Sequence, residues 1–340
     1  FDLKTGNELW QYRGTSSLQV KNDVYTSRAA PTPVADDSGV YAFFESGNTV
    51  ALDLDGGVRW QRSLIDDYGK YAGRFGLGGS LAQWDDRLFV LADNEGPSYL
   101  LAIDKASGET IWKSDRSSRT AWSSPMIVTV DGQPQVVVSS SGSVDGYDPG
   151  SGELLWSFDN VGGNTVASPI PFGDGRFLIG AAPGRDGENS EGAKQSNMAM
   201  QIVKQGEGYT ASVLWRNLQA TSSFGSPIVY AGYAYYTNRA GVLYCLDAAT
   251  GETAYTARIG DSNWATPIGA AGRVYVFGKS GGTTVLATGP EEKVLAENKL
   301  WESEDGGGPG GFAAEIQYGV AVTDAGFVVR TGTRLFLIGG

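Results

Sequence analysis

Short apolar stretches with the alternation of a β-strand recur along the whole chain, and many of them end in an aspartate. In one of them, Leu243–Leu246, Asp247 follows directly and Gly251 stands four residues later. The aspartate carboxylate can accept backbone N–H bonds across a turn, and the glycine supplies the left-handed residue that closes a bulged hairpin. The pattern therefore predicts a strand, a tight turn and a second strand.

An aromatic residue follows each turn at a fixed place in the second strand, where it is large enough to fill a gap between two sheets. It recurs at intervals of 40 to 59 residues. The closing aromatic residues are Trp10, Trp60, Trp112, Trp156, Trp215 and Tyr255, with a degenerate seventh copy near Leu295. A period of about 40 to 50 residues with several short strands in each repeat indicates a propeller or an array.

A second pattern falls between these hairpins: serine or threonine, then proline, then an apolar stretch. Ser124–Ile127 and Ser226–Val229 are examples. A further apolar stretch follows each copy, such as Tyr233–Tyr236. Each repeat is therefore expected to hold four strands.

Seven repeats of about 48 residues account for the 340 residues, whereas an eighth would need a repeat that the sequence does not show. The chain opens inside a hairpin of the first pattern, Phe1–Trp10, and closes on the apolar stretch Arg334–Ile338. We therefore expect one domain over residues 1–340, an all-β, seven-bladed β-propeller of four-stranded antiparallel blades. The amino-terminal strand would complete the last blade and remove the exposed edges that a linear array leaves.

The net charge and the counts of histidine and cysteine exclude several classes of function. With 26 basic and 38 acidic residues the net charge is −12, which disfavours nucleic acid and anionic membrane surfaces as partners. The absence of histidine excludes Ser-His-Asp and Cys-His catalysis and histidine metal sites. Cys245 is the only cysteine, so no internal disulfide can form. No apolar run approaches the roughly 18 residues of a membrane span, and no direct membrane insertion is expected.

The stretch Ala102–Trp112 (AIDKASGETIW) resembles the tryptophan-docking motif of the PQQ-like β-propellers, and copies run from end to end of the chain. The resemblance implies that each closing aromatic residue lies between neighbouring blades. The family includes quinoprotein dehydrogenases, which oxidise alcohols or sugars, and non-catalytic BamB-like outer-membrane assembly factors, which bind other proteins. The motif is specific for the fold and not for the function, because a motif spread evenly around a ring cannot be one active site.

In a propeller, ligands bind where the loops that enter the inner strands converge, and those loops precede the Ser-Pro strands. Three arginines there could present guanidinium groups to an anion, and three aromatic residues could form a flat wall for a planar or sugar-like ligand. The candidates at this axial mouth are Arg28, Arg74, Arg119, Trp122, Asn164, Phe224, Trp264 and Glu315. The alternative is that these side chains plug the channel and pair with one another.

The resemblance also implies what a quinoprotein enzyme would need. Alcohol-oxidising members stack the quinone between a tryptophan and a disulfide of adjacent cysteines, and they hold Ca²⁺ beside a catalytic aspartate. Asn164 and Glu315 could be two calcium ligands, but no aspartate falls in the loops near them, and a single cysteine cannot form the disulfide. We therefore assign no catalytic residue and no metal ligand, and expect neither PQQ nor calcium. If the chain is an enzyme, the fold points to a PQQ-dependent dehydrogenase.

The resulting hypothesis is a non-catalytic scaffold that binds protein or polymer partners through its loops, as the BamB-like relatives do. The irregular insertions Gln61–Phe75 and Gly184–Asn197 are the expected contact loops. The resemblance further implies a periplasmic or otherwise exported protein, and we expect a monomer. Two alternatives stay open: a binder of small molecules or carbohydrates at the axial mouth, and a PQQ-dependent oxidoreductase of alcohols or sugars.

Overall fold

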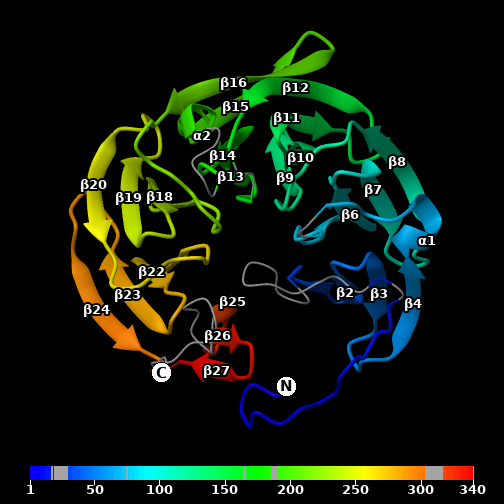
Figure 1. The fold of residues 1–340 in the computed structure, drawn as a ribbon, viewed down its shortest axis with the longest axis horizontal. Coiled ribbons are helices and arrows are strands. Elements are labelled where there is room, and N and C mark those ends of the chain that lie inside the picture. Colours follow the sequence, from blue (N-terminus) through cyan, green and yellow to red (C-terminus); the bar gives the residue numbers. More distant parts are fainter. Residues whose placement is uncertain are drawn as a thin grey trace. The chain divides into compact units, whose positions relative to one another are not determined.

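The computed structural model describes residues 1–16, 18, 30–73, 76–163, 166–184, 190–302 and 317–339. They form two compact units, one of residues 1–159 with 203–210 and one of residues 160–202 with 211–340. Within each sheet the strands are antiparallel and lie in chain order, as Figure 1 shows.

The first unit holds three four-stranded sheets. The first sheet comprises β1 (Val34–Asp36), β2 (Gly39–Phe43), β3 (Asn48–Leu52) and β4 (Val58–Ser63). The second comprises β5 (Ala82–Trp84), β6 (Arg87–Ala92), β7 (Ser98–Asp104) and β8 (Thr110–Arg116). The third comprises β9 (Met126–Val130), β10 (Gln133–Ser139), β11 (Gly142–Tyr147) and β12 (Leu154–Val161).

The second unit holds most of the remaining sheets. The turn of the fourth sheet, residues 203–210, belongs to the first unit, and the last two residues of β12 belong to the second. The fourth comprises β13 (Ile170–Gly173), β14 (Arg176–Ile179), β15 (Met198–Gln205) and β16 (Gly208–Arg216). The fifth comprises β17 (Ile228–Tyr230), β18 (Tyr233–Thr237), β19 (Val242–Asp247) and β20 (Thr253–Arg258). The sixth comprises β21 (Ile268–Ala270), β22 (Arg273–Phe277), β23 (Gly282–Ala287) and β24 (Val294–Lys299), and the seventh β25 (Gln317–Thr323), β26 (Gly326–Thr331) and β27 (Leu335–Ile338).

The repeated turn has the hydrogen bonds that its residue types predict. Between β7 and β8, the Asp104 carboxylate accepts the backbone N–H groups two and three residues further on, at 3.0 and 2.7 Å. Gly108 has a φ of +75°, and the ladder shifts register between Ala102 and Ile103. The hydrogen bonds from Ser107 hold the pKa of Asp104 below its ordinary value. A bulged hairpin follows, because the glycine accepts the left-handed conformation that the bulge needs.

Apolar side chains fill the space between consecutive sheets within each unit. One cluster joins Tyr41 and Phe43 of the first sheet to Leu88 and Leu101 of the second. Alternate residues of each strand face opposite sides of its sheet, so the middle strands bury side chains on both faces. In β7 the six residues before Asp104 are all buried.

The sheets and their strand order confirm the predicted all-β, β-propeller class of fold. Six sheets have four strands, and the last has three among the described residues. We expected Phe1–Trp10 to supply its fourth strand, but this segment carries no strand in the structure. Two other contacts fix the segment. The Asp2 carboxylate accepts the backbone N–H of Thr5 in a local turn, and the Trp10 indole donates to the carbonyl oxygen of Leu54. Neither contact requires that the segment pair with another strand. The single domain over residues 1–340 stays a prediction.

Two short helices lie in the insertions that the sequence analysis singled out as contact loops. They are α1 (Leu64–Tyr68) and α2 (Ser190–Gln195). Residues 74, 75 and 185–189 of these insertions lie outside the described residues. Across the parts of the chain that the structure describes, no helix has the length and apolar character to cross a bilayer.

Candidate functional site

Four of the expected docking tryptophans contact the turn of the next repeat in the same way. The Trp112 indole N–H donates to the carbonyl oxygen of Pro149 at 3.0 Å. A Cβ at Gly152 would lie 2.5 Å from the Trp112 ring, so the ring needs a glycine beneath it. The equivalent hydrogen bonds at Trp10, Trp60 and Trp215 measure 2.9, 2.9 and 3.0 Å. Each indole thus holds two consecutive repeats together.

Trp156 packs differently, on its own sheet. Its indole N–H donates to Gln135 Oε1 at 2.6 Å, and its ring covers Gly146. The next hairpin along the chain turns at Gln205–Gly208 (QGEG) and has no turn aspartate. Because no docking turn follows, the indole finds its hydrogen-bond acceptor in a buried amide of the same sheet.

Trp301 is a packed aromatic residue that the sequence analysis missed. It is buried, its ring lies against Gly281, and it stacks on Phe336 with ring centroids 5.9 Å apart. It does not stand at the fixed distance from a turn aspartate that identified the others. The remaining signal was its position 46 residues after Tyr255, within the range of the repeat. Leu295, where the degenerate copy was placed, is 44% exposed.

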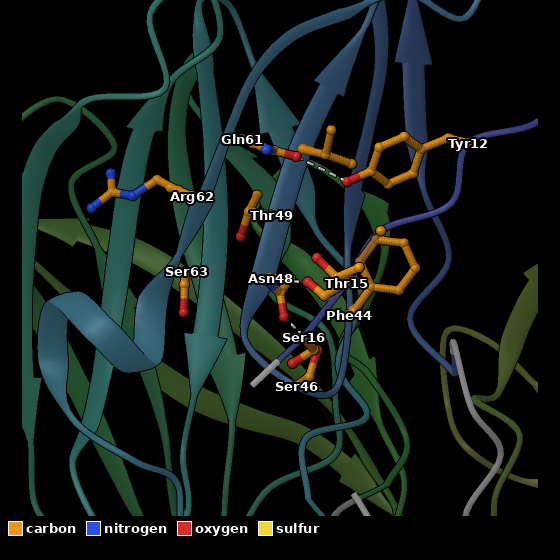
Figure 2. A pocket seen from close by; sticks show the side chains of 12 residues that line it. Tyr12, Thr15, Ser16, Phe44, Ser46, Asn48, Thr49, Gln61, Arg62 and Ser63 are labelled. Atoms are coloured by element: carbon orange, nitrogen blue, oxygen red, sulfur yellow. Dashed lines mark hydrogen bonds between the residues drawn. The ribbon is translucent and has the colours of Figure 1, made fainter. Parts of the chain in front are cut away.

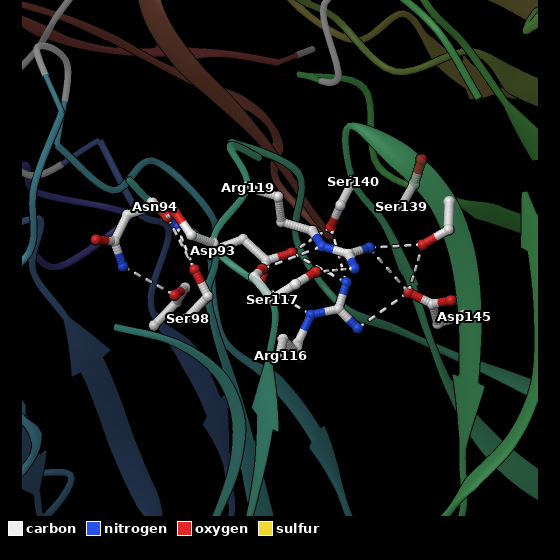
Figure 3. A network of polar contacts seen from close by, with 12 residues as sticks. Asp93, Asn94, Ser98, Arg116, Ser117, Arg119, Ser139, Ser140 and Asp145 are labelled. Atoms are coloured by element: carbon white, nitrogen blue, oxygen red, sulfur yellow. Dashed lines mark hydrogen bonds and ion pairs between the residues drawn. The ribbon is translucent and has the colours of Figure 1, made fainter. Parts of the chain in front are cut away.

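A buried cluster of charges joins the second and third sheets (Figure 3). Arg116, at the end of β8, donates from Nε and Nη2 to the two carboxylate oxygens of Asp93 at 2.8 and 3.0 Å. Its Nη1 lies 3.0 Å from Oδ2 of Asp145 in β11. The side chains of Arg116, Asp93 and Asp145 are 2%, 0% and 6% exposed. Burial by itself would lower the pKa of Arg116, but Asp93 raises it above its ordinary value.

Serine hydroxyls complete this charge cluster. Ser140 donates to Asp93, while Ser143 and Ser157 donate to Asp145 at 2.8 and 2.6 Å. Removing one partner of such a buried, hydrogen-bonded ion pair would leave an uncompensated charge, which costs about 3–5 kcal/mol. The cluster therefore holds the loops that follow β6 and β10 in place, which is a structural role.

Two of the mouth candidates, Arg119 and Trp122, lie before β9 in the first unit and bind other parts of that unit. Arg119 Nη1 donates to Ser143 Oγ at 2.6 Å and lies 3.6 Å from Asp145 Oδ2. The Trp122 indole N–H donates to the carbonyl oxygen of Gly76 at 3.2 Å. Both side chains thus make contacts within the first unit, and a role of either at an axial mouth stays a prediction.

Phe224 and Trp264, two further candidates, come together in the second unit. Their ring centroids lie 4.6 Å apart at an interplanar angle of 39°. Lys279 Nζ stands 4.1 Å from the centroid of the Trp264 ring, a cation–π arrangement. Burial lowers the pKa of Lys279, and the nearby Asp261 carboxylate opposes that effect. All three side chains of this group remain partly exposed.

Four mouth candidates lie outside the described residues: Arg28, Arg74, Asn164 and Glu315. Their roles as anion or calcium ligands stay predictions.

A pocket of about 320 Å³ opens in the first unit between residues 12–16 and the β3–β4 hairpin (Figure 2). Tyr12 OH donates to Gln61 Oε1 at 3.2 Å across it, and Ser46 Oγ donates to Asn48 Oδ1 at 2.9 Å. Arg62, at its edge, points away from the pocket and is bound to Asp67 at 2.6 Å. Apart from Arg62, the lining therefore supplies neutral hydrogen-bonding and apolar groups.

The insertion that contains α1 is fixed to the second sheet. The N–H of Ala72 donates to Asn94 Oδ1 at 3.0 Å, and the hydroxyls of Tyr71 and Tyr99 lie 3.1 Å apart. Its exposed charged side chains are Asp66, Asp67 and Lys70. The insertion is therefore an ordered surface with charges on its outer face.

The described residues do not fit a quinone with its calcium. Cys245 is buried in β19, where burial raises its pKa to about 11, and its Sγ lies 3.6 Å from the carbonyl oxygen of Gly289. Across the ladder it faces Tyr255, which occupies the docking position of that repeat. Within the described ranges no three His, Cys, Asp or Glu side chains are grouped to hold a metal. That the protein works without PQQ or calcium stays a prediction.

Three comparisons with known proteins match this chain to proteins of the same description. The family model described as outer membrane protein assembly factor BamB matches residues 1–75, 75–175 and 199–335. A curated relative of the same description from Alkalilimnicola ehrlichii is 25% identical over 187 residues, which is 53% of this chain and 43% of the relative. The match thus spans less than half of that relative's length.

A solved structure is also similar. BamB from Moraxella catarrhalis superposes with a TM-score of 0.63 at 16% identity, over 88% of this chain and 82% of that one. At such an identity the likeness shows the fold alone.

Proposed function

Because this chain belongs to the family of the outer membrane protein assembly factor BamB, we propose that it is a non-catalytic scaffold that binds protein partners through its loops. The observation that carries the proposal is the match of the family model in three stretches between residues 1 and 335. The chemistry of the described residues agrees with it, since the charged groups of the buried cluster at Arg116 are committed to one another.

The part of the α1 insertion that follows β4, residues 64–73, is the contact surface that the proposal favours in the first unit. It is an addition to the four-strand repeat, so the fold itself does not explain it, and such loops often carry binding. Its hydrogen bond to Asn94 holds it in place before any partner arrives, which reduces the entropy lost on binding. Asp66 and Lys70 on its outer face suit the polar rim of a protein interface.

The family membership is also the reason to propose that the protein is exported and acts as a monomer beside the outer membrane. Fractionation of the native host tests the location: the chain should be found in the envelope fraction. Recovery in the cytoplasmic fraction would contradict this part of the proposal.

Site-specific photocrosslinking in the native host tests partner binding. A photoreactive phenylalanine replaces Asp66 or Lys70 on the insertion, and Glu252 in an exposed docking turn of the second unit serves as the control position. We expect adducts with proteins of the outer-membrane assembly machinery from positions 66 and 70, identified by mass spectrometry.

Position 252 should yield few adducts, since the turn beside it, Asp247–Gly251, serves to bind the indole of Trp215. Absence of adducts at 66 and 70, or an identical set of adducts from all three positions, would contradict binding through the insertion.

A further inference from the structure

Four loops of the second unit are tied together around Phe224 and Trp264. Residues 221–225 precede β17 and residues 261–265 precede β21, while residues 238–241 and 278–281 join the middle strands of the same two sheets. We call these four loops the cationic loop surface, for the reason given below.

Hydrogen bonds connect the loops in series. The backbone N–H of Arg239 donates to Ser223 Oγ at 3.1 Å. Ser262 Oγ donates to the carbonyl oxygen of Arg239 at 2.8 Å, and the N–H of Lys279 donates to the carbonyl oxygen of Ser262 at 2.7 Å. The backbones that carry Arg239 and Lys279 are therefore fixed relative to the aromatic pair.

These loops carry a charge opposite to that of the whole chain. They hold two cations, Arg239 and Lys279, and one anion, Asp261, in a chain whose net charge is −12. The Asp261 carboxylate accepts the backbone N–H groups of Ser280 and Gly282 at 2.8 and 3.2 Å, and its charge also acts on Lys279. The loops therefore carry one positive charge more than negative. The Arg239 side chain is exposed.

The aromatic pair adds apolar contact area beside these cations. Lys279 already stands over the Trp264 ring, and Phe224 packs against the same ring at 4.6 Å. With a cation and a second ring on it, Trp264 is poorly placed to stack on a further planar ligand. Aromatic residues and arginine are, however, the residue types that dominate protein interfaces.

We propose that the cationic loop surface binds a carboxylate-bearing segment of a protein partner, with Arg239 and Lys279 pairing with its acidic side chains and Phe224 contacting an apolar neighbour. The inference rests on the scaffold function proposed above. Complementary charge selects the occupant, since an acidic segment would be repelled by most of this chain and attracted here.

Fluorescence anisotropy tests the inference with the full chain and a short labelled peptide in which glutamate alternates with leucine. The wild-type protein should bind this peptide, and the affinity should fall as salt is added because exposed charges are screened. Arg239→Glu with Lys279→Glu should weaken binding by at least about tenfold. A milder pair, Arg239→Ala with Lys279→Ala, keeps the test valid if the charge reversal perturbs folding.

Arg273→Glu is the matched control, because Arg273 is an exposed cation at the opposite end of β22. It should change the affinity less than about twofold. No binding by the wild-type chain, or equal binding by the wild type and both double variants, would overturn the inference. Equally tight binding of a lysine–leucine peptide would also overturn it, because the surface would then not select carboxylates.

The crosslinking experiment separates the two proposals. If adducts form at positions 66 and 70 but the peptide does not bind, the scaffold function holds and the cationic loop surface is not a binding site. If the peptide binds but no adducts form in the host, the loop surface stands as an acidic-peptide site and the insertion does not.

Discussion

At the residue scale, single side chains connect parts of the chain that are distant in sequence. The side chain of Trp112, in β8, packs over Gly152, which lies forty residues further along the chain. Lys105, in the turn after β7, reaches back to Asp36 at the end of β1, with Nζ 2.7 Å from Oδ2. Both contacts join consecutive repeats, so each can be measured by removing one side chain.

Trp112→Ala should lower the free energy of unfolding by about 3–5 kcal/mol, because it removes a large buried ring and leaves a cavity. Urea unfolding of both proteins measures the difference. Leu154→Ala is the control, since Leu154 is 50% exposed in the next repeat and its loss should cost under about 0.5 kcal/mol. Equal unfolding midpoints for Trp112→Ala and wild type would show that the indole does not hold the repeats together.

The Asp36–Lys105 pair should make stability depend on pH in the acid range. The hydrogen bond from Lys105, with that from Ser38, lowers the pKa of Asp36 from 3.8 to about 2. Because the folded pKa lies below the unfolded one, the pair stabilises the protein above about pH 4, and this contribution is lost as the pH falls through about 2.

Asp36→Asn should therefore be less stable than wild type at neutral pH, by under about 1 kcal/mol because the pair is partly exposed. The difference should shrink as the pH falls and vanish below about pH 2, as measured by urea unfolding across the range. Asp37→Asn makes the same charge change one residue away without removing the pair with Lys105, and serves as the control. A gap between Asp36→Asn and wild type that stays at its neutral-pH size below about pH 2 would assign it to something other than this ion pair.

At the element scale, one buried amide contributes to holding the α1 insertion in place. Asn94 is 3% exposed. Its Oδ1 accepts the N–H groups of Ala72 and Gly96 at 3.0 and 2.7 Å, and its Nδ2 donates to the carbonyl oxygen of Pro97 at 2.6 Å. One side chain thus ties the insertion to the β6–β7 loop.

Asn94→Ala should release the insertion, because it leaves the Ala72 N–H without its acceptor. Hydrogen exchange at residues 69–73 should become faster, and the free energy of unfolding should fall by about 1–3 kcal/mol. Asn48→Ala removes an amide at the start of β3 in the same unit and should leave exchange at 69–73 unchanged. Unaltered exchange in Asn94→Ala would mean that the apolar contacts of α1 suffice to hold the insertion.

At the scale of the whole molecule, the question is whether this chain binds the cofactors of the quinoprotein dehydrogenases, whose repeats it resembles. We expect no change in the thermal unfolding temperature with PQQ and Ca²⁺ in large excess, because a lone buried cysteine cannot form the disulfide that would stack on the quinone. A ligand at about 100 times its dissociation constant would add roughly 2.7 kcal/mol, so binding would be visible. A rise that needs both additives would contradict the scaffold proposal, and each additive alone is the control.

Much of the fold could be predicted because its signals are local. The Asp104 turn needs only an aspartate, a glycine and their spacing, and the backbone bonds that it forms lie within four residues. The number of repeats followed from the recurrence of that turn. The strand expected at Phe1–Trp10 is absent because pairing is a long-range event, and the local pattern specifies only the turn and the tryptophan.

The contacts of the candidate site residues could not be predicted from local sequence patterns. Arg119 and Trp122 were predicted to lie at an axial mouth from the position of their loops, but their partners, Ser143 and the Gly76 carbonyl, carry no motif that points to them. Lys279 was overlooked for the same reason, since only the folded loops place its ammonium over the Trp264 ring.

Sequence alone therefore determined the repeat, its turns and the positions of most docking aromatics, since these depend on residue type and spacing along a few residues of chain. Tertiary structure decided which acceptor each indole uses and which charges meet. The Trp156 indole donates to Gln135 of its own sheet, and Arg116 forms ion pairs with Asp93 and Asp145 across two sheets. The physical reason is that buried polar groups must find partners, and which partners are near is known only once the sheets have packed.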